Sequence, residues 1–378
     1  MSIVKSFKFK KIISLYFYIC FFIFLNSKNS LSTQVYFLFL HGMPEKPNIL
    51  TPLKEKLEER FNKVNITFNF LYPHLPDSES IDTWAENVAK VIKKWDKAKN
   101  IVIIGLSMGG KVAVHLTANK KYGVQHKIDT VITINSPLLP LKNFRNKFFG
   151  KYYPSFVLPF ISSYVLGYEK PDGLRDVIYF DSSKEVKWIK ENKHFLAFVS
   201  GNNNPKNKGN DYFPWCSDDG IVPLSAQYVE GTPAIYYGEK EHEAVFLDPE
   251  VTEIIAQAIF DYLSGNPIIS FEKFKSGFVR FKRKGLFSPS SQKVIIKLPL
   301  PEGRKRSHFE IKILSDNYPF LLHQANVKCK WANRKDEKDA SLIIEVSNLL
   351  PFEEVFIRWT VFQKKLIIRN KPFIGVNL

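Results

Sequence analysis

The feature that most constrains the fold is an alternation of short apolar runs with amphipathic helical patterns from residue 34 to residue 264. The apolar runs predict strands at 35–40, 66–70, 101–105, 130–134, 195–200 and 234–237. The helical patterns between them cover 50–61, 81–95, 108–119, 184–191 and 249–263. Strands that are separated by helices pair in parallel and are buried on both faces. The sequence therefore predicts a doubly wound, mostly parallel α/β sheet.

Two segments depart from this alternation. Residues 137–182 are rich in Pro, Phe and Tyr and show no clear period, so we interpret them as a cap insertion. The apolar side chains between Tyr152 and Leu166 suit a lid for an acyl chain. They equally suit a packed subdomain without that role.

A second domain is expected at residues 268–378, after the stop-and-linker signal at 264–267. Here the pattern changes to short alternating runs with no helix between them. This pattern is typical of a small all-β, sandwich-like domain. Its strands are expected at 277–282, 293–298, 309–314, 342–346 and 355–362.

The N-terminus has the order of a signal peptide. Four lysines and no acid precede an uncharged apolar stretch at residues 12–25. A helix of that length spans only about 21 Å, which is short of the roughly 30 Å hydrocarbon core. We therefore expect residues 1–30 to be a signal peptide cleaved between residues 26 and 33, with an N-terminal anchor as the alternative. Either reading predicts a protein that is secreted, periplasmic or anchored on the outside of a membrane.

The segment Gly105-Leu106-Ser107-Met108-Gly109 carries the sharpest chemical signal. A nucleophilic serine must project from a tight turn, and side chains two residues to either side would collide with the neighbouring backbone. Gly105 and Gly109 remove those collisions. A bare G-x-S-x-G arises by chance in about one chain in ten of this length. The apolar run before it and the helix after it are typical of a nucleophile elbow.

A serine nucleophile also requires a histidine base, which follows it in the chain on this kind of sheet. His242 follows the predicted strand at 234–237 and precedes the last helix. His194 precedes a strand, at the wrong end of the sheet. His242 is therefore the expected general base.

The acid that orients the histidine is expected at Asp219, in the polar loop that follows the strand at 195–200. Asp218 is a near alternative and Asp181 a distant one. The competing role for Asp219 is that of a turn residue before Gly220.

Residues 34–264 resemble the α/β-hydrolase fold, in its lipase and esterase branch. The resemblance rests on His41-Gly42 after the first strand, on GLSMGG at 105–110, on DDGIVP at 218–223 and on His242 before the last helix. It implies that Ser107 is the nucleophile, Asp219 the orienting acid and His242 the general base. It also implies that the backbone N–H groups of Met43 and Met108 form an oxyanion hole.

The chain departs from the pattern of that fold in two places. Its first strand follows the N-terminal segment almost at once, so the first two strands of the full fold are expected to be missing, as in small lipases. Ser136-Pro137-Leu138 stands where many lipid esterases have a threonine, proline, histidine, glycine run. The subfamily is therefore left open.

Charge is concentrated in the C-terminal third, where residues 265–378 hold 22 basic and 10 acidic residues. The excess favours anionic partners. No metal-ligand cluster, phosphate-binding loop or nucleic-acid motif accompanies it, so neither a metal, a cofactor nor nucleic acid is expected. The basic domain would suit peripheral contact with an anionic membrane. The alternative is that its lysines keep a Phe-rich protein soluble.

These observations predict an exported serine hydrolase that cleaves a small-molecule or lipid carboxylic ester through an acyl-enzyme. A thioesterase or an amidase on the same triad is the first alternative. A catalytically inactive scaffold that binds the cell envelope is the second, and an intact Ser, Asp and His in the expected order argues against it.

Overall fold

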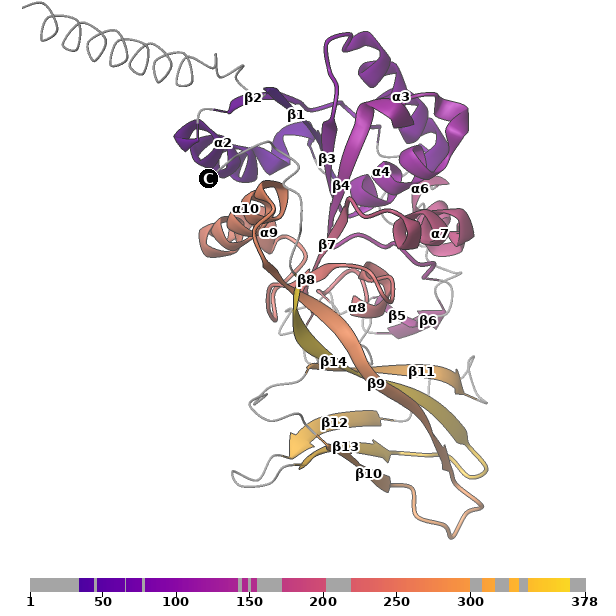
Figure 1. Ribbon diagram of the computed structural model, residues 1–378. Helices are drawn as coiled ribbons and strands as arrows, with labels where there is room; N and C mark the ends of the chain where they lie inside the picture. Colours follow the sequence, from indigo (N-terminus) through magenta and orange to yellow (C-terminus); the bar gives the residue numbers. More distant parts are fainter. Residues whose placement is uncertain are drawn as a thin grey trace, which may run out of the picture.

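A computed structural model of the protein describes residues 34–43, 46–64, 66–76, 79–141, 145–148, 151–154, 172–201, 219–299, 308–316, 326–332 and 339–367. Figure 1 shows an α/β domain built on one central sheet and, below it, an all-β part. The expected signal peptide at residues 1–30 lies outside the described residues. No helix of the described ranges is long and apolar enough to cross a membrane.

The central sheet has six strands in the order β2-β1-β3-β4-β7-β8, and every pair is parallel. All of β3 is buried, and so is β1 after its first residue, as expected for strands covered on both faces. The strands are β1 Gln34–Leu40, β2 Thr67–Leu71, β3 Ile101–Leu106, β4 Ile128–Ile134, β7 Phe195–Val199 and β8 Ala234–Tyr236. The expected doubly wound sheet is confirmed.

Two hydrophobic cores lie on the two faces of this sheet. Along β1, Tyr36, Leu38 and Leu40 face one core, and Val35, Phe37 and Phe39 face the other. In Figure 1, α3, α4, α6 and α7 lie on one side of the sheet and α2, α9 and α10 on the other. The helices are α2 Thr51–Lys63, α3 Ile81–Lys94, α4 Met108–Ala118, α6 Asp172–Tyr179, α7 Ser183–Glu191, α8 Leu224–Gln227, α9 Ala244–Leu247 and α10 Pro249–Ser264. Short 3₁₀ helices occupy Pro47–Leu50, Lys120–Tyr122 and Gln125–Lys127.

Local sequence sets the ends of α10. The Asp248 side chain accepts hydrogen bonds from the backbone N–H groups of Glu250 and Val251, and Pro249 occupies the first helical position. Gly265 ends the helix with a φ of 81°, a conformation that glycine adopts without steric cost.

The expected cap insertion is described only in part. It contains the hairpin of β5 (Arg145–Phe148) and β6 (Lys151–Pro154), and the helix α6 near its end. Residues 155–171, which hold most of its apolar side chains, lie outside the described residues.

The C-terminal part consists of two antiparallel three-stranded sheets, β10-β13-β12 and β11-β14-β9. Phe281 of β9 and Ile357 of β14 share one core with Leu342 and Ile344 of β13, so the two sheets pack face to face. The strands are β9 Ile268–Lys282, β10 Gln292–Pro299, β11 His308–Asp316, β12 Asn326–Ala332, β13 Asp339–Ser347 and β14 Glu354–Ile367. We call this unit the sandwich.

The sandwich is joined directly to the α/β domain. β9 begins at Ile268, which is buried in a core of the α/β domain, and Ile367 at the end of β14 packs against the same core. The Ser270 hydroxyl accepts a hydrogen bond from the Ala234 backbone N–H at 3.0 Å. The long pair β9 and β14 therefore links the two parts (Figure 1).

Candidate active site

Ser107 lies in the turn between β3 and α4, with φ of 52° and ψ of −125°. This is a region that residues other than glycine rarely adopt. The backbone N–H of Ser107 donates to the Ile134 carbonyl at the end of β4, at 2.9 Å. The turn is thus held against the neighbouring strand in a strained conformation.

The glycines around Ser107 are required by close backbone contacts. A Cβ on Gly105 would lie 2.4 Å from the Gly110 backbone, and a Cβ on Gly109 would lie 2.4 Å from the Leu40 carbonyl oxygen. A Cβ on Gly110 would lie 1.9 Å from the Ser136 hydroxyl. Real Cβ atoms do not come so close to backbone, so a side chain on Gly105 or Gly109 would push α4 away from the sheet and displace Ser107, whereas one on Gly110 would first displace the Ser136 side chain.

Asp219 and His242 form a buried pair in the loops that follow β7 and β8. His242 Nδ1 lies 2.7 Å from Asp219 Oδ2, and the two residues are 4% and 1% exposed. The His242 backbone N–H also donates to the Asp219 carbonyl, at 2.8 Å. Since Nδ1 faces the carboxylate, Nε2 is the ring nitrogen on the side away from Asp219.

The Asp219 carboxylate is fixed by further N–H donors. Its Oδ1 accepts from the backbone N–H groups of Ile221 and Val222, at 3.0 and 2.7 Å. Its Oδ2 accepts from Gln227 Nε2 at 3.2 Å. Gln227 lies in the short helix α8 and also bonds both backbone groups of Ser200, so it ties the Asp219 loop to the end of β7. Sequence reasoning missed Gln227, because only the folded loop brings it to Asp219.

Asn135 connects the serine turn to the histidine loop. It follows Ile134, the residue that accepts the Ser107 N–H, and its Nδ2 donates to the His242 carbonyl at 3.3 Å. Ser200 donates to Asn135 Oδ1 at 3.2 Å. Ser107, Asp219 and His242 therefore all lie at the carboxyl edge of the sheet, where ligands of open α/β sheets bind.

Met43 and Met108 lie together beneath α6. A Cβ built on Gly173 would be 3.1 Å from Met108 Cε and 3.3 Å from Met43 Sδ. Met108 is the first residue of α4, where backbone N–H groups fall outside the hydrogen-bond pattern of the helix itself. The two expected oxyanion-hole residues are thus brought to one place, next to the serine turn.

His41 has a structural role beside Met43. The backbone N–H of Leu75 donates to His41 Nε2 at 3.2 Å, so this nitrogen is the acceptor and the proton is on Nδ1. Nδ1 then donates to the Gly42 carbonyl at 2.7 Å. His41 is fully buried, and both ring nitrogens hold the loop that presents Met43.

The alternatives for the base and the acid lie elsewhere. His194 precedes β7 and pairs with Asp129 at 2.8 Å, at the amino edge of the sheet. Asp181 accepts from the backbone N–H of Ser183 at 3.0 Å, at the start of α7. Asp218 lies outside the described residues. Among the residues that are described, no group of His, Cys, Asp and Glu side chains could hold a metal ion.

Residues 78–216 match the family of PGAP1-like alpha/beta domains. The matched segment includes the serine turn and ends before Asp219. Residues 34–264 adopt the α/β-hydrolase fold. A search of curated proteins finds no relative by sequence.

Solved structures with some likeness to this chain include several hydrolases. The propeptide form of the lipase BlEst2 from Bacillus licheniformis is 10% identical, with a TM-score of 0.43, and the match covers 90% of this chain and 76% of that chain. The methylesterase MES16 from Arabidopsis is 11% identical, with a TM-score of 0.36, and the match covers 61% of this chain and 100% of that chain. The esterase EaEST from Exiguobacterium antarcticum is 13% identical, with a TM-score of 0.39, and the match covers 61% of this chain and 92% of that chain.

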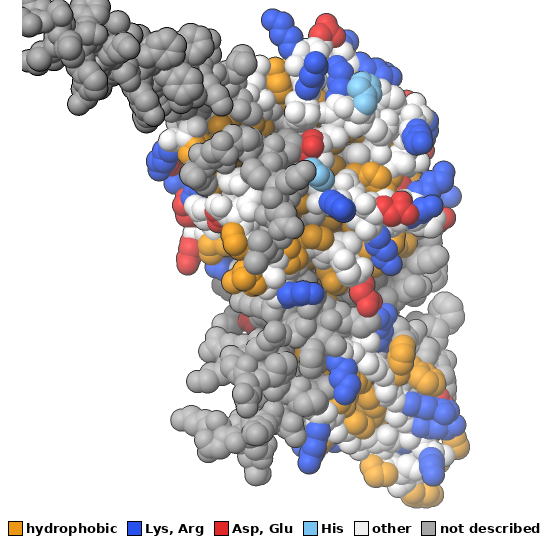
Figure 2. Space-filling model, viewed as in Figure 1, with side chains coloured by type: hydrophobic (Ala, Val, Ile, Leu, Met, Phe, Trp, Pro, Cys, Tyr) orange, Lys and Arg blue, Asp and Glu red, His pale blue; other side chains and the backbone are white. Residues whose placement is uncertain are grey.

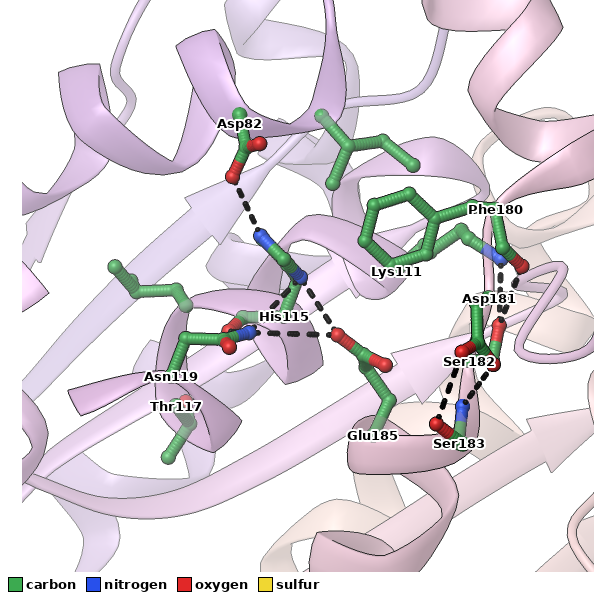
Figure 3. A network of polar contacts seen from close by, with 12 residues as sticks. Asp82, Lys111, His115, Thr117, Asn119, Phe180, Asp181, Ser182, Ser183 and Glu185 are labelled. Carbon is green, nitrogen blue, oxygen red and sulfur yellow. Dashed lines mark hydrogen bonds and ion pairs between the residues drawn. The ribbon is translucent and has the colours of Figure 1, made fainter. Parts of the chain in front are cut away.

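A network of polar side chains anchors α4, the helix that follows Ser107 (Figure 3). His115, two turns after Ser107, places Nδ1 2.6 Å from Glu185 of α7 and Nε2 2.9 Å from Asp82 of α3. Lys111, one turn after Ser107, donates from Nζ to the Pro137 carbonyl at 3.0 Å and to the Ser182 hydroxyl at 3.3 Å. Pro137 and Ser182 are the two ends of the cap insertion. Lys111 therefore ties both ends of the cap to the helix that carries the serine.

Lys111 predicts a pH dependence of stability. Burial lowers the pKa of Lys111 to about 8 from an ordinary value of 10.5, against the opposing effect of Glu185 and Asp176. Lys111 therefore binds its proton more tightly in the unfolded chain than in the folded one. Burying the protonated side chain lowers the free energy of unfolding below pH 8, and this loss disappears as the pH rises to 10.5. We expect the parent chain to gain at most about 3 kcal/mol of unfolding free energy relative to Lys111→Met across that range.

Urea denaturation of both chains at several pH values measures this difference. Parallel stability curves for the two chains would show that Lys111 does not titrate in this window.

Proposed function

We propose that this α/β-hydrolase is a serine hydrolase that cleaves carboxylic esters by means of Ser107, His242 and Asp219. The observation that carries the proposal is the contact of 2.7 Å between His242 Nδ1 and Asp219 Oδ2, at the same sheet edge as the strained Ser107 turn. Export by residues 1–30 stays a prediction from the sequence.

The first half of the reaction forms an acyl-enzyme. Ser107 Oγ attacks the ester carbonyl while His242 Nε2 accepts its proton, and the Asp219 carboxylate stabilises the imidazolium. The backbone N–H groups of Met43 and Met108 stabilise the negative charge on the carbonyl oxygen. The C–O bond to the alcohol then breaks, and His242 returns the proton to the departing oxygen.

The second half releases the acid. His242 takes a proton from a water molecule, which attacks the acyl carbonyl, and the proton passes to Ser107 Oγ as the acyl bond breaks. Ser107 and His242 end in their starting states. The carboxylic acid is the second product.

The surroundings of Ser107 favour an apolar acyl group. The side chains of Met43 and Met108 lie close to Gly173 of α6, so two thioether groups lie together beside the residue that follows Ser107. Methionine adapts its shape to apolar ligands. A thioester or an amide would react through the same groups, and only the leaving group separates these substrates.

Turnover of a matched substrate series tests the proposal on the full-length chain. We expect hydrolysis of p-nitrophenyl esters, with kcat/KM rising from acetyl to longer acyl chains, and much slower hydrolysis of the corresponding anilides. Thioesters of the same acyl groups serve as the third arm. Faster turnover of anilides or thioesters than of the oxygen esters would contradict the ester assignment.

A further inference from the structure

Two loops lie side by side at one end of the sandwich. They are residues 283–291, between β9 and β10, and residues 348–353, between β13 and β14. The Arg283 backbone N–H donates to the Glu353 carbonyl at 2.9 Å, and the Leu349 N–H donates to the Ser290 carbonyl at 3.0 Å. We call these two loops the sandwich tip. In Figure 1 they lie at the end of the sandwich that faces away from the hydrolase domain.

The sandwich tip exposes three large apolar side chains. Phe287 is 103% exposed, Leu286 is 69% exposed and Phe352 is 63% exposed. A single exposed apolar residue is ordinary on a protein surface. Three on two hydrogen-bonded loops at one end of a domain mark a surface that a partner covers.

Arg283 holds the first loop in shape. Its guanidinium donates to the carbonyl oxygens of Leu286, Ser288 and Leu349, at 2.7, 2.9 and 2.6 Å. The backbone is thus fixed on both sides of Phe287, and the same side chain joins the two loops. Phe287 is therefore presented to solvent by a fixed loop, so little conformational entropy is lost when a partner buries it.

The second loop is held in an unfavourable conformation. Phe352 has a φ of 65°, a backbone conformation that is rare and energetically unfavourable for an aromatic residue. The Glu353 carboxylate accepts from the Leu350 backbone N–H at 2.5 Å, and the Glu353 N–H donates back to the Leu350 carbonyl at 3.0 Å. These bonds keep the strained turn and leave the Phe352 ring exposed. Strain of this kind is found at functional sites.

Basic side chains surround the apolar ones. Lys282, Lys284 and Lys293 are exposed, and residues 273–301 contain no Asp or Glu. The acidic partners on neighbouring strands are Glu345, which lies 3.4 Å from Lys293, and Glu354, which pairs with Arg280 and Lys282. Figure 2 shows hydrophobic and basic side chains together over this end of the molecule. The surface therefore combines an apolar tip with an excess of positive charge.

We propose that the sandwich tip inserts Leu286, Phe287 and Phe352 into the interface of an anionic lipid bilayer, with the flanking lysines at the head groups. Apolar side chains that enter the acyl boundary and lysines that meet anionic lipid are the two contributions that hold peripheral proteins on membranes. At about 3.3 Å per residue, the 15 residues of β9 place the tip roughly 45 Å from the start of that strand. The hydrolase domain is then held away from the bilayer surface. This inference is independent of the proposed reaction.

Flotation with vesicles tests the proposal on the full-length chain. The vesicles are phosphatidylcholine alone or with about 30% phosphatidylserine, at low and high salt. The variant combines Leu286→Ser, Phe287→Ser and Phe352→Asn, because asparagine tolerates a positive φ. Phe278→Ser, at a side chain of the same domain that is 68% exposed but lies in β9, is the matched control.

We expect the parent chain and the control to bind the anionic vesicles, and the triple variant to bind them about 100-fold more weakly. High salt should weaken binding of the parent. The same N-terminal segment is present in every chain, so the difference reports the tip. Thermal unfolding of each variant shows whether it is folded. If the triple variant does not fold, Phe287→Ser alone is compared with the parent chain instead.

Three results would overturn the proposal. The first is a parent chain that does not bind anionic vesicles, and the second is a folded tip variant that binds them as the parent does. The third is a tip variant that changes only self-association in analytical ultracentrifugation, which would assign the surface to a second copy of the chain.

Discussion

Replacing Ser107 with alanine is expected to lower kcat for ester hydrolysis by about 10⁶-fold while the protein stays folded. Both half-reactions pass through Ser107 Oγ, so no acyl-enzyme forms without it. The fold should survive because alanine keeps the Cβ, and the Ser107 backbone N–H to the Ile134 carbonyl is unchanged. Steady-state kinetics and thermal unfolding on the same preparation measure the two effects.

Ser183→Ala is the matched control for this substitution, since Ser183 is exposed at the start of α7 and its hydroxyl donates to Asp181 within the same turn. It should leave kcat unchanged. Full activity in Ser107→Ala would rule out this serine as the nucleophile.

Replacing Asp219 with asparagine is expected to reduce kcat by about 10⁴-fold. If the asparagine NH2 group faces His242 Nδ1, it donates to that nitrogen and the ring proton is held on Nε2, where it blocks the base. If the amide oxygen faces Nδ1, the neutral amide no longer stabilises the imidazolium. The bonds from the Ile221 and Val222 N–H groups to Oδ1 have an acceptor in asparagine as well, and Gln227 Nε2, which loses its acceptor at Oδ2, keeps its bonds to the Ser200 and Val222 carbonyls. The protein should therefore remain folded while the rate falls.

Asp218→Asn is the control, because it removes a carboxylate one residue away. It should change kcat by less than about tenfold, whereas the loss in Asp219→Asn should be seen in kcat at saturating ester. A large loss in Asp218→Asn with a small loss in Asp219→Asn would move the acid assignment by one residue.

The α/β domain was predictable because its strands are buried on both faces and its helices are amphipathic. The expected helix at 108–119 is α4 at Met108–Ala118, and the expected strand at 101–105 is β3 at Ile101–Leu106. Periodicity fixes the element type in such segments, and end positions shift by a residue or two.

The sandwich was less predictable. β12, Asn326–Ala332, was not expected, although Val327, Cys329 and Trp331 alternate with lysines. β9 begins at Ile268, nine residues before the expected strand at 277–282, because the Ser-Gly-Asn-Pro signal suggested a longer connection. A strand paired for most of its length with β14 depends on contacts far away in the sequence, which local patterns do not report.

At the candidate site, the chain order and the elbow pattern predicted Ser107, Asp219 and His242 as the catalytic residues, and the three lie at one edge of the sheet. The residues that position these three side chains could not be predicted from the sequence. Gln227 and Asn135 carry no local motif, and their roles arise from loops that meet only at the sheet edge. Lys111 would be expected at the surface on composition alone, yet it is 2% exposed between the two ends of the cap.

Peptide mapping of the chain after reaction with a fluorophosphonate measures directly whether Ser107 is an activated nucleophile. We expect one phosphonyl adduct, located on the peptide that contains Ser107, with labelling lost in Ser107→Ala and strongly slowed in His242→Ala. An unmodified Ser107 under conditions that label a reference serine hydrolase, or an adduct on a different serine, would contradict it.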